Sequence, residues 1–142
     1  MDKQQIILAA LAAAGENATF SPVQVQKLFF LIDREASHLV EGPHFNFSAY
    51  DYGPFDRAVY DELDVLSFAG LVETQSSGRY RKYVLTPKGY EAGVTRLQEM
   101  PPKASSFVTR AAKWVRELSF QQLVAAIYNR YPDMKVNSIF RG

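Results

Sequence analysis

One helix constrains the fold of this chain more than any other feature, because it is apolar on several faces. Its start is fully specified: Ser21 suits the N-cap, Pro22 the first helical position and Gln24 the third position of a capping box. The apolar side chains that follow are Val25, Leu28, Phe29, Phe30, Leu31 and Ile32. A helix with so wide an apolar surface must be covered on several sides, so we expect it at the centre of the core.

Helical periodicity and breaker residues predict five further helices around the central one. The first covers residues 2–14 and ends at Gly15. The next begins at Pro54, which suits a first helical position, and runs to residue 69. The other three are expected from Thr86 to the Pro101-Pro102 break, around residues 107–118, and from Ser119 to Tyr131.

Alternation of apolar and polar residues predicts short strands between these helices. Phe45, Phe47 and Ala49 alternate with polar residues, which predicts an extended segment with one buried face and with His44 on the other. Residues 71–74 and 79–85 predict a β-hairpin connected by residues 75–78. Residues 50–55 predict a tight turn, in which Gly53 supplies backbone freedom.

The order of these elements is helix, helix, short strand, helix, hairpin, helix, which is the winged-helix arrangement with the hairpin as its wing. We therefore predict a mainly α protein with a small β-hairpin, organised as a winged-helix-like domain over residues 1–100. Residues 101–142 are predicted to form a C-terminal helical extension packed on the same domain. The break near Pro101 is too short to be a linker between independent domains.

Composition excludes several kinds of site. The 142 residues include no cysteine, which removes disulfides, thiolate metal sites and cysteine nucleophiles. The longest apolar stretch, residues 6–14, is shorter than the about 20 residues that span a bilayer, and it fits an N-terminal helix better than a signal peptide. We therefore expect a cytoplasmic protein with no membrane partner, no metal and no cofactor.

No pattern for catalysis stands out. The sequence has no Gly-x-Ser-x-Gly elbow, no phosphate-binding glycine loop and no dinucleotide fingerprint. His44 has serine and aspartate neighbours in sequence, but extended geometry spreads them over both faces, so a histidine satisfied in a loop or at the surface is favoured. Asp61, Glu62 and Asp64 lack an opposing carboxylate for a divalent cation, which favours a solvated helix face. We predict that the protein is not an enzyme.

Charge is divided unevenly along the sequence. Residues 1–74 carry four basic side chains against eleven acidic ones, a net charge of −7. Residues 75–142 carry twelve basic side chains against four acidic ones, a net charge of +8. Such a division indicates either attraction between the two halves or charged partners, and both interpretations stay open.

A nucleic-acid partner is the less favoured binding hypothesis. In a helix-turn-helix protein the recognition helix enters the major groove, but the predicted helix 54–69 carries four carboxylates against one arginine, and phosphates would repel them. The wing suits phosphates better, because Arg79, Arg81 and Lys82 are interleaved with tyrosines. The alternative function is therefore a DNA-binding transcriptional regulator with a basic wing, unless the hairpin is only a solubilising surface.

A protein partner is favoured. At about 100° per residue, Asp61 and Asp64 lie away from the apolar stripe of the predicted helix 54–69. Together with Arg57 and Tyr60, they form the predicted protein-binding face, which suits a basic protein surface.

Three blocks of sequence resemble a known family. Residues 25–35, Val-Gln-Lys-Leu-Phe-Phe-Leu-Ile-Asp-Arg-Glu, resemble the Lys-Leu helix of Panacea (SocA-like antitoxin) domains and of the related YwgA-like proteins. Tyr52-Gly53-Pro54 and the residues that follow it resemble the family's Tyr-Gly-Pro block, and residues 123–132 are similar to the end of the YwgA-like group. The resemblance implies a non-enzymatic accessory protein of prokaryotic or phage origin. It would act as an antitoxin or proteolytic adaptor by binding another protein, such as a toxin.

Overall fold

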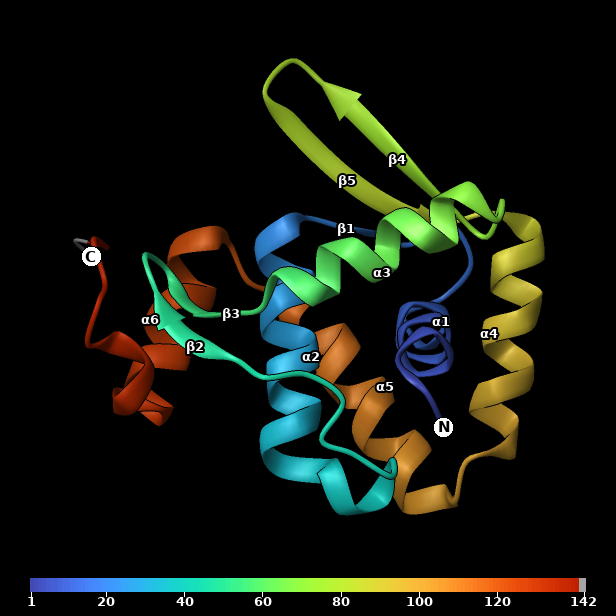
Figure 1. Ribbon diagram of the computed structural model, residues 1–142, viewed down its shortest axis with the longest axis horizontal. Coiled ribbons are helices and arrows are strands. Elements are labelled where there is room, and N and C mark those ends of the chain that lie inside the picture. Colours follow the sequence, from blue (N-terminus) through green and yellow to red (C-terminus); the bar gives the residue numbers. More distant parts are fainter. Residues whose placement is uncertain (141–142) are drawn as a thin grey trace.

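The structure, a computed structural model, describes residues 1–140 apart from the side chain of Ser77. Over this range the protein is mainly helical, as predicted, and it has two small antiparallel sheets (Figure 1). The helices are α1 (Lys3–Ala13), α2 (Pro22–Ala36), α3 (Arg57–Phe68), α4 (Pro87–Glu99), α5 (Pro102–Glu117) and α6 (Phe120–Arg130), with 3-10 turns at Ser37–Leu39 and Pro132–Lys135. The strands are β1 (Thr19–Phe20), β2 (Ser48–Tyr50), β3 (Gly53–Phe55), β4 (Val72–Ser77) and β5 (Tyr80–Leu85).

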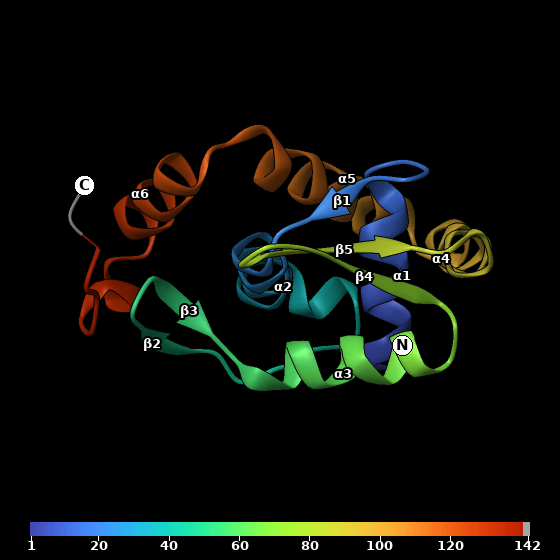
Figure 2. The same cartoon turned by 90° about the horizontal axis from the view of Figure 1, so that it is seen from above.

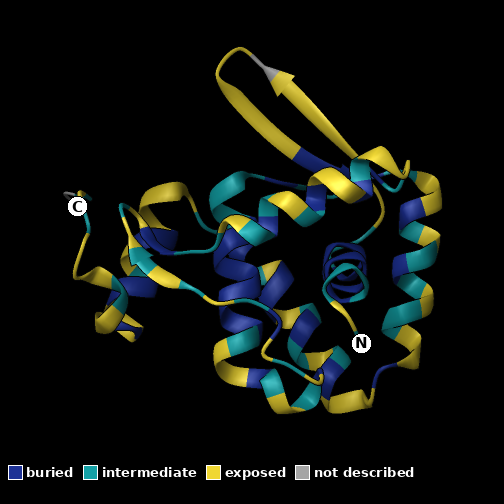
Figure 3. Cartoon of the chain, viewed as in Figure 1, coloured by how far each residue is buried: buried dark blue, intermediate teal, exposed yellow. Residues whose placement is uncertain are grey.

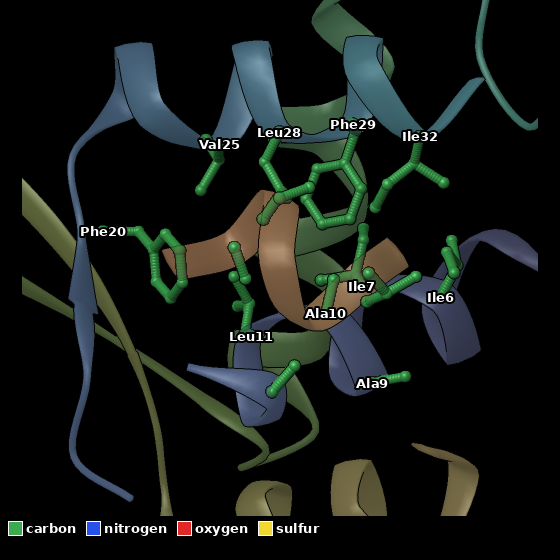
Figure 4. Close-up of a cluster of buried hydrophobic side chains, with 14 of the residues drawn as sticks. Ile6, Ile7, Ala9, Ala10, Leu11, Phe20, Val25, Leu28, Phe29 and Ile32 are labelled. Carbon is green, nitrogen blue, oxygen red and sulfur yellow. The ribbon is translucent and has the colours of Figure 1, made fainter. Parts of the chain in front are cut away.

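Helix α2 has the start and the central position that its sequence predicts. The Ser21 hydroxyl accepts a hydrogen bond from the Gln24 backbone N–H, and the Gln24 side chain accepts one from the Ser21 N–H, which completes the capping box. In the core, Leu28, Phe29 and Ile32 point from α2 toward α1 (Figure 4). Each is almost fully buried, and burying a side chain of this size stabilises the fold by about 1.5–3 kcal/mol.

Helix α1 lies between α2 and α4 (Figure 1). It is buried along most of its length, over residues Ile6, Ile7, Leu8, Ala9, Ala10, Leu11, Ala12 and Ala13. Two glycines of α4 allow the backbone of neighbouring segments to approach this helix closely. A Cβ atom at Gly93 would overlap the Leu8 carbonyl of α1, and one at Gly89 would overlap the Leu71 carbonyl oxygen just before β4.

The first sheet has the antiparallel strand order β1-β5-β4, and its β4–β5 hairpin projects away from the helices (Figure 1). The hairpin is confirmed, but its predicted connection is wrong. Strand β4 continues to residue 77, and the turn is the two-residue segment Gly78-Arg79, in which Gly78 has a φ of 63°. Polar residues such as Gln75 fit a strand here because the outer hairpin is exposed on both faces (Figure 3).

The predicted helix start at Pro54 is also wrong. Residues 53–55 form strand β3, which pairs with β2, and α3 begins only at Arg57. Asp56 sets this boundary, because its side chain accepts a hydrogen bond from the Ala58 backbone N–H at 2.9 Å. Phe55 therefore belongs to the β2–β3 hairpin rather than to the inward stripe of α3, whose buried residues are Val59, Leu63 and Leu66.

Helices α5 and α6 lie on one side of the molecule, opposite α3 and the β2–β3 hairpin (Figure 2). Helix α5 packs on α1 and α2 and buries Ala104, Val108, Ala111, Ala112 and Val115. Helix α6 begins with the predicted capping box of Ser119 and Gln122. Beyond α6 the backbone returns to the β2–β3 hairpin, where the Ile139 N–H donates a hydrogen bond to the Asp51 carbonyl. Within residues 1–140, no helix is long and apolar enough to cross a membrane.

Changing Gly89 to alanine tests the close packing of α4. An alanine inside a helix normally stabilises it by roughly 0.5–1 kcal/mol relative to glycine. At this position the added methyl group meets backbone, because the Leu71 carbonyl also accepts the Thr86 N–H at 3.1 Å. We expect Gly89→Ala to lower the free energy of unfolding by about 1–3 kcal/mol, measured by urea denaturation. The exposed Glu91→Ala change in the same helix is the control and should stay within about 0.5 kcal/mol. A Gly89→Ala protein as stable as its parent would contradict this packing.

Candidate protein-binding surface

The exposed side of α3 carries three of the predicted site residues. Arg57, Asp61 and Asp64 are all exposed, and Arg57 Nε lies 3.6 Å from Asp61 Oδ1. An ion pair in this setting contributes little to stability, since solvent screens it. These charges therefore have no evident role in holding the fold.

The other two carboxylates of this region have structural contacts instead. Asp56 caps α3, and its second carboxylate oxygen accepts a hydrogen bond from the Asn46 N–H at 2.7 Å. Glu62 accepts a hydrogen bond from the Gln4 side chain of α1 at 3.1 Å. The acidic side chains of α3 that hold no other element of the fold are Asp61 and Asp64.

Two apolar side chains share this side of α3, and the sequence interpretation did not single them out. Phe68 is 98% exposed and Val65 is 50% exposed. At about 100° per residue, both lie within roughly 40° of Asp61 around the helix axis. We call Arg57, Asp61, Asp64, Val65 and Phe68 the α3 face.

Tyr60 lies apart from the α3 face. It is half-buried, and its ring stacks on Tyr83 of β5 with the centroids 6.4 Å apart. Its hydroxyl donates a hydrogen bond to the Pro22 carbonyl at 3.4 Å, and burial raises the pKa of Tyr60 above its usual value. Tyr60 thus joins α3 to the β4–β5 hairpin and to the start of α2.

The basic residues of the hairpin, Arg79, Arg81 and Lys82, are all exposed. Arg81 lies over the rings of Tyr60 and Tyr83, with its guanidinium carbon 5.3 Å from each centroid. Strand alternation predicts Arg79, Arg81 and Tyr83 on one face, but Arg79 is in the turn rather than on the strand. Even so, Arg79, Arg81 and Lys82 all line a groove of about 500 Å³ between the hairpin and the start of α2.

Two buried polar side chains of α2 hold the segment that leads into α3. The Gln26 amide exchanges two hydrogen bonds with the Asp56 backbone, at 2.9 and 3.0 Å. Lys27 is only 3% exposed, and its ammonium donates to the Pro54 carbonyl at 3.4 Å. Burial lowers the pKa of Lys27 to about 7. The sequence interpretation did not single out this lysine, and the signal that could have indicated it is a lysine directly before the apolar run 28–32.

His44 is buried rather than outward-facing. Its Nε2 atom lies 2.7 Å from the Val40 carbonyl oxygen, and its backbone N–H donates to Asp33 Oδ1 at 2.9 Å. The remaining alternation of residues 45–49 is as predicted, with the two phenylalanines half-buried and Asn46 exposed. His44 is thus a satisfied structural side chain.

Comparisons with known proteins do not assign this sequence to a family. No family model matches it, no curated protein matches it, and no solved structure matches it. Within the described residues, no three His, Asp or Glu side chains are grouped so that they could hold a metal ion.

The low pKa of Lys27 predicts how stability depends on pH. Between about pH 7 and 10.5 the unfolded protein binds a proton at Lys27 that the folded protein does not, so the free energy of unfolding should rise with pH. One such group adds up to about 1.4 kcal/mol to the free energy of unfolding for each pH unit in this range. We expect Lys27→Met to remove this slope, measured by urea denaturation at pH 7, 8 and 9. The exposed Lys88→Met change is the matched control and should keep the slope. Parallel pH profiles for the parent protein and Lys27→Met would contradict the burial of this charge.

Proposed function

We propose that this protein is a non-enzymatic protein-interaction module of winged-helix type, which serves as an antitoxin-like or adaptor-like accessory protein of prokaryotic or phage origin. The order α1, β1, α2, α3, β4, β5 and the strand order β1-β5-β4 support a winged helix, with β4–β5 as its wing. The hairpin β2–β3 is then an insertion between the second and third helices. In this arrangement α3 holds the recognition position.

The observation that carries the protein-binding proposal is the exposed Phe68 on the α3 face. A fully exposed phenylalanine leaves its apolar ring in water, and aromatic residues are enriched where proteins bind one another. Val65 extends this apolar surface, and Asp61 and Asp64 border it with negative charge. A protein surface that offers an apolar pocket rimmed with lysine or arginine fits both parts of the α3 face.

The α3 face is tested with a photo-crosslinking side chain in cells that encode the protein. We expect p-benzoylphenylalanine at position 68 to crosslink to one basic protein, and the same side chain at the exposed Val136 not to do so. Recovery of the same crosslinked protein from both positions would contradict the proposal that the α3 face is the binding surface.

The charges are tested on the protein that is captured. The double variant Asp61→Lys, Asp64→Lys should associate more slowly with the captured protein, because electrostatic attraction chiefly raises the association rate. Glu91→Lys with Glu117→Lys makes the same change in net charge at exposed sites on α4 and α5, and it should leave the association rate nearly unchanged. Thermal unfolding should shift little in both variants. Equal association rates for the two variants would mean that the α3 face is only solvated surface.

A DNA-binding regulator is the second candidate function, and the groove lined by Arg79, Arg81 and Lys82 favours it. If the groove holds phosphates, duplex DNA should bind at low salt, and its affinity should fall steeply as salt rises. Changing these three residues to glutamate should abolish the binding. Glutamates at the exposed Lys88, Lys103 and Lys113 are the control and should preserve most of it. Absence of binding by the parent protein at low salt would reject this candidate.

A further inference from the structure

A pocket of about 320 Å³ opens between α2, the β2–β3 hairpin, Tyr60 of α3 and the first residue of α6. Elements from four parts of the sequence meet there, and the pocket lies outside the α3 face. Its lining includes Lys27, Tyr50, Asp51, Tyr52, Tyr60 and Phe120. Pockets of about 300 Å³ and above are large enough for small organic ligands.

The walls of this pocket are aromatic and partly open to solvent. Tyr50 packs on Phe55 with the ring centroids 5.1 Å apart, and Tyr52 meets Phe120 edge-on at 5.2 Å. Three of these four rings remain substantially exposed, at 53% for Tyr50, 41% for Tyr52 and 43% for Phe120. Their exposed faces are available to the apolar body of a ligand.

Lys27 contributes the buried polar group of this pocket. An ammonium group has three N–H donors, and among the described residues this one has a single acceptor, the Pro54 carbonyl at 3.4 Å. The side chain is 3% exposed, so bulk water does not supply the missing acceptors freely. A buried ammonium with unused donors favours an anionic oxygen in contact with it.

The other titratable groups near this amine limit the charge of the ligand. The β2–β3 hairpin contributes Asp51, Tyr50 and Tyr52 to the lining, and α3 contributes Tyr60. Tyr128 of α6 lies against Gly53 beside the Lys27 amine. Asp51 is a second charged group in the pocket lining, and its carboxylate would repel a dianion more strongly than a monoanion. A monocarboxylate fits this balance better than a phosphate monoester.

We propose that this pocket binds a monocarboxylate attached to an aromatic or aliphatic body, with Lys27 contacting the carboxylate and the tyrosine and phenylalanine rings contacting the body. The carboxylate belongs either to a free small molecule or to the C-terminus of a peptide, because both present the same chemistry. The site goes beyond the proposed protein-interaction function and does not depend on it.

Binding should depend on pH in a defined direction. Only the protonated amine attracts a carboxylate, and the pKa of Lys27 in the free protein is about 7. The affinity should therefore be highest below pH 7 and fall by up to about tenfold for each pH unit above it. A carboxylate that binds would in turn raise the pKa of Lys27.

The test uses 3-phenylpropionate and its neutral amide as probes, with calorimetry and amide chemical shifts at pH 6 and pH 8.5. We expect the carboxylate to bind at pH 6, to shift resonances of residues 26–27 and 50–55, and to bind at least tenfold more weakly at pH 8.5. The amide should bind far more weakly than the carboxylate. Equal affinity for the acid and the amide, or no binding at millimolar concentration, would overturn the proposal.

Variants separate this site from nonspecific binding. Lys27→Met should lose at least tenfold in affinity for the carboxylate, and Phe120→Ala should also weaken it, while Lys88→Met should leave it unchanged. Phe120 is partly exposed, so its variant keeps the test valid if Lys27→Met does not fold. Unchanged affinity in Phe120→Ala would also overturn the proposal.

Two peptide probes identify the source of the carboxylate. A tripeptide that ends in phenylalanine is compared with its C-terminally amidated form. Binding of the free-acid peptide as tightly as 3-phenylpropionate would assign the pocket to the C-termini of peptides. Much weaker binding of that peptide would assign it to free carboxylates.

Discussion

The reciprocal hydrogen bonds between the Gln26 amide and the Asp56 backbone connect the central helix to the start of α3, on which the exposed face and one wall of the pocket depend. Gln26 is 2% exposed, so these two bonds form where water cannot replace them. They fix the point at which β3 ends and α3 begins, while the carboxylate of Asp56 caps α3 and holds the Asn46 N–H. The direction of α3, the exposure of its outer face and the wall of the aromatic pocket all follow from this junction.

Local signals predict most of the helices, because the determinants lie within a few residues of each other. The capping boxes of Ser21 and Ser119 are examples: in each, a hydroxyl and a glutamine three residues later satisfy each other's backbone groups. The burial of Val59, Leu63 and Leu66 likewise follows from helical periodicity alone. The same arithmetic places Asp61 and Asp64 on the exposed side, where the structure has them.

The errors occur where pairing or packing with another segment decides between two local choices. Pro54 fits the first turn of a helix and also an edge strand, and pairing with β2 together with Asp56 selects the strand. The short strand β1 exists because it pairs with β5, far along the sequence. The role of Gly89 could not be predicted from sequence, since it depends on the approach of the Leu71 carbonyl. The sequence singles out Lys27 only as part of a block that resembles a known family. The burial of its amine becomes evident only in the tertiary structure.

The charge asymmetry of the sequence is only partly neutralised within the fold. Among residues 1–140, one ion pair joins an acidic side chain of the first half to a basic side chain of the second, Glu35 of α2 with Arg130 of α6 at 3.9 Å. Arg34 of α2 also pairs with Asp133 in the 3-10 turn after α6, at 2.7 Å, but this pair uses the minority charge of each half and does not reduce the asymmetry. Helix α5, which carries the exposed Lys103 and Lys113, lies on the side opposite α3 (Figure 2).

On the α3 side, one carboxylate of α3 and one arginine of the hairpin act on the same tyrosine. Burial raises the pKa of Tyr83 to about 12. The positive charge of Arg81 opposes this increase and the negative charge of Asp64 adds to it, so both charges act on the same hydroxyl. A DNA phosphate held by Arg81 would therefore be repelled by Asp64, because salt at physiological concentration screens charges only beyond about 8 Å. A basic protein would instead be attracted by Asp61 and Asp64 and could cover Phe68 at the same time. The charges and the exposed aromatic ring of α3 thus favour the same kind of partner.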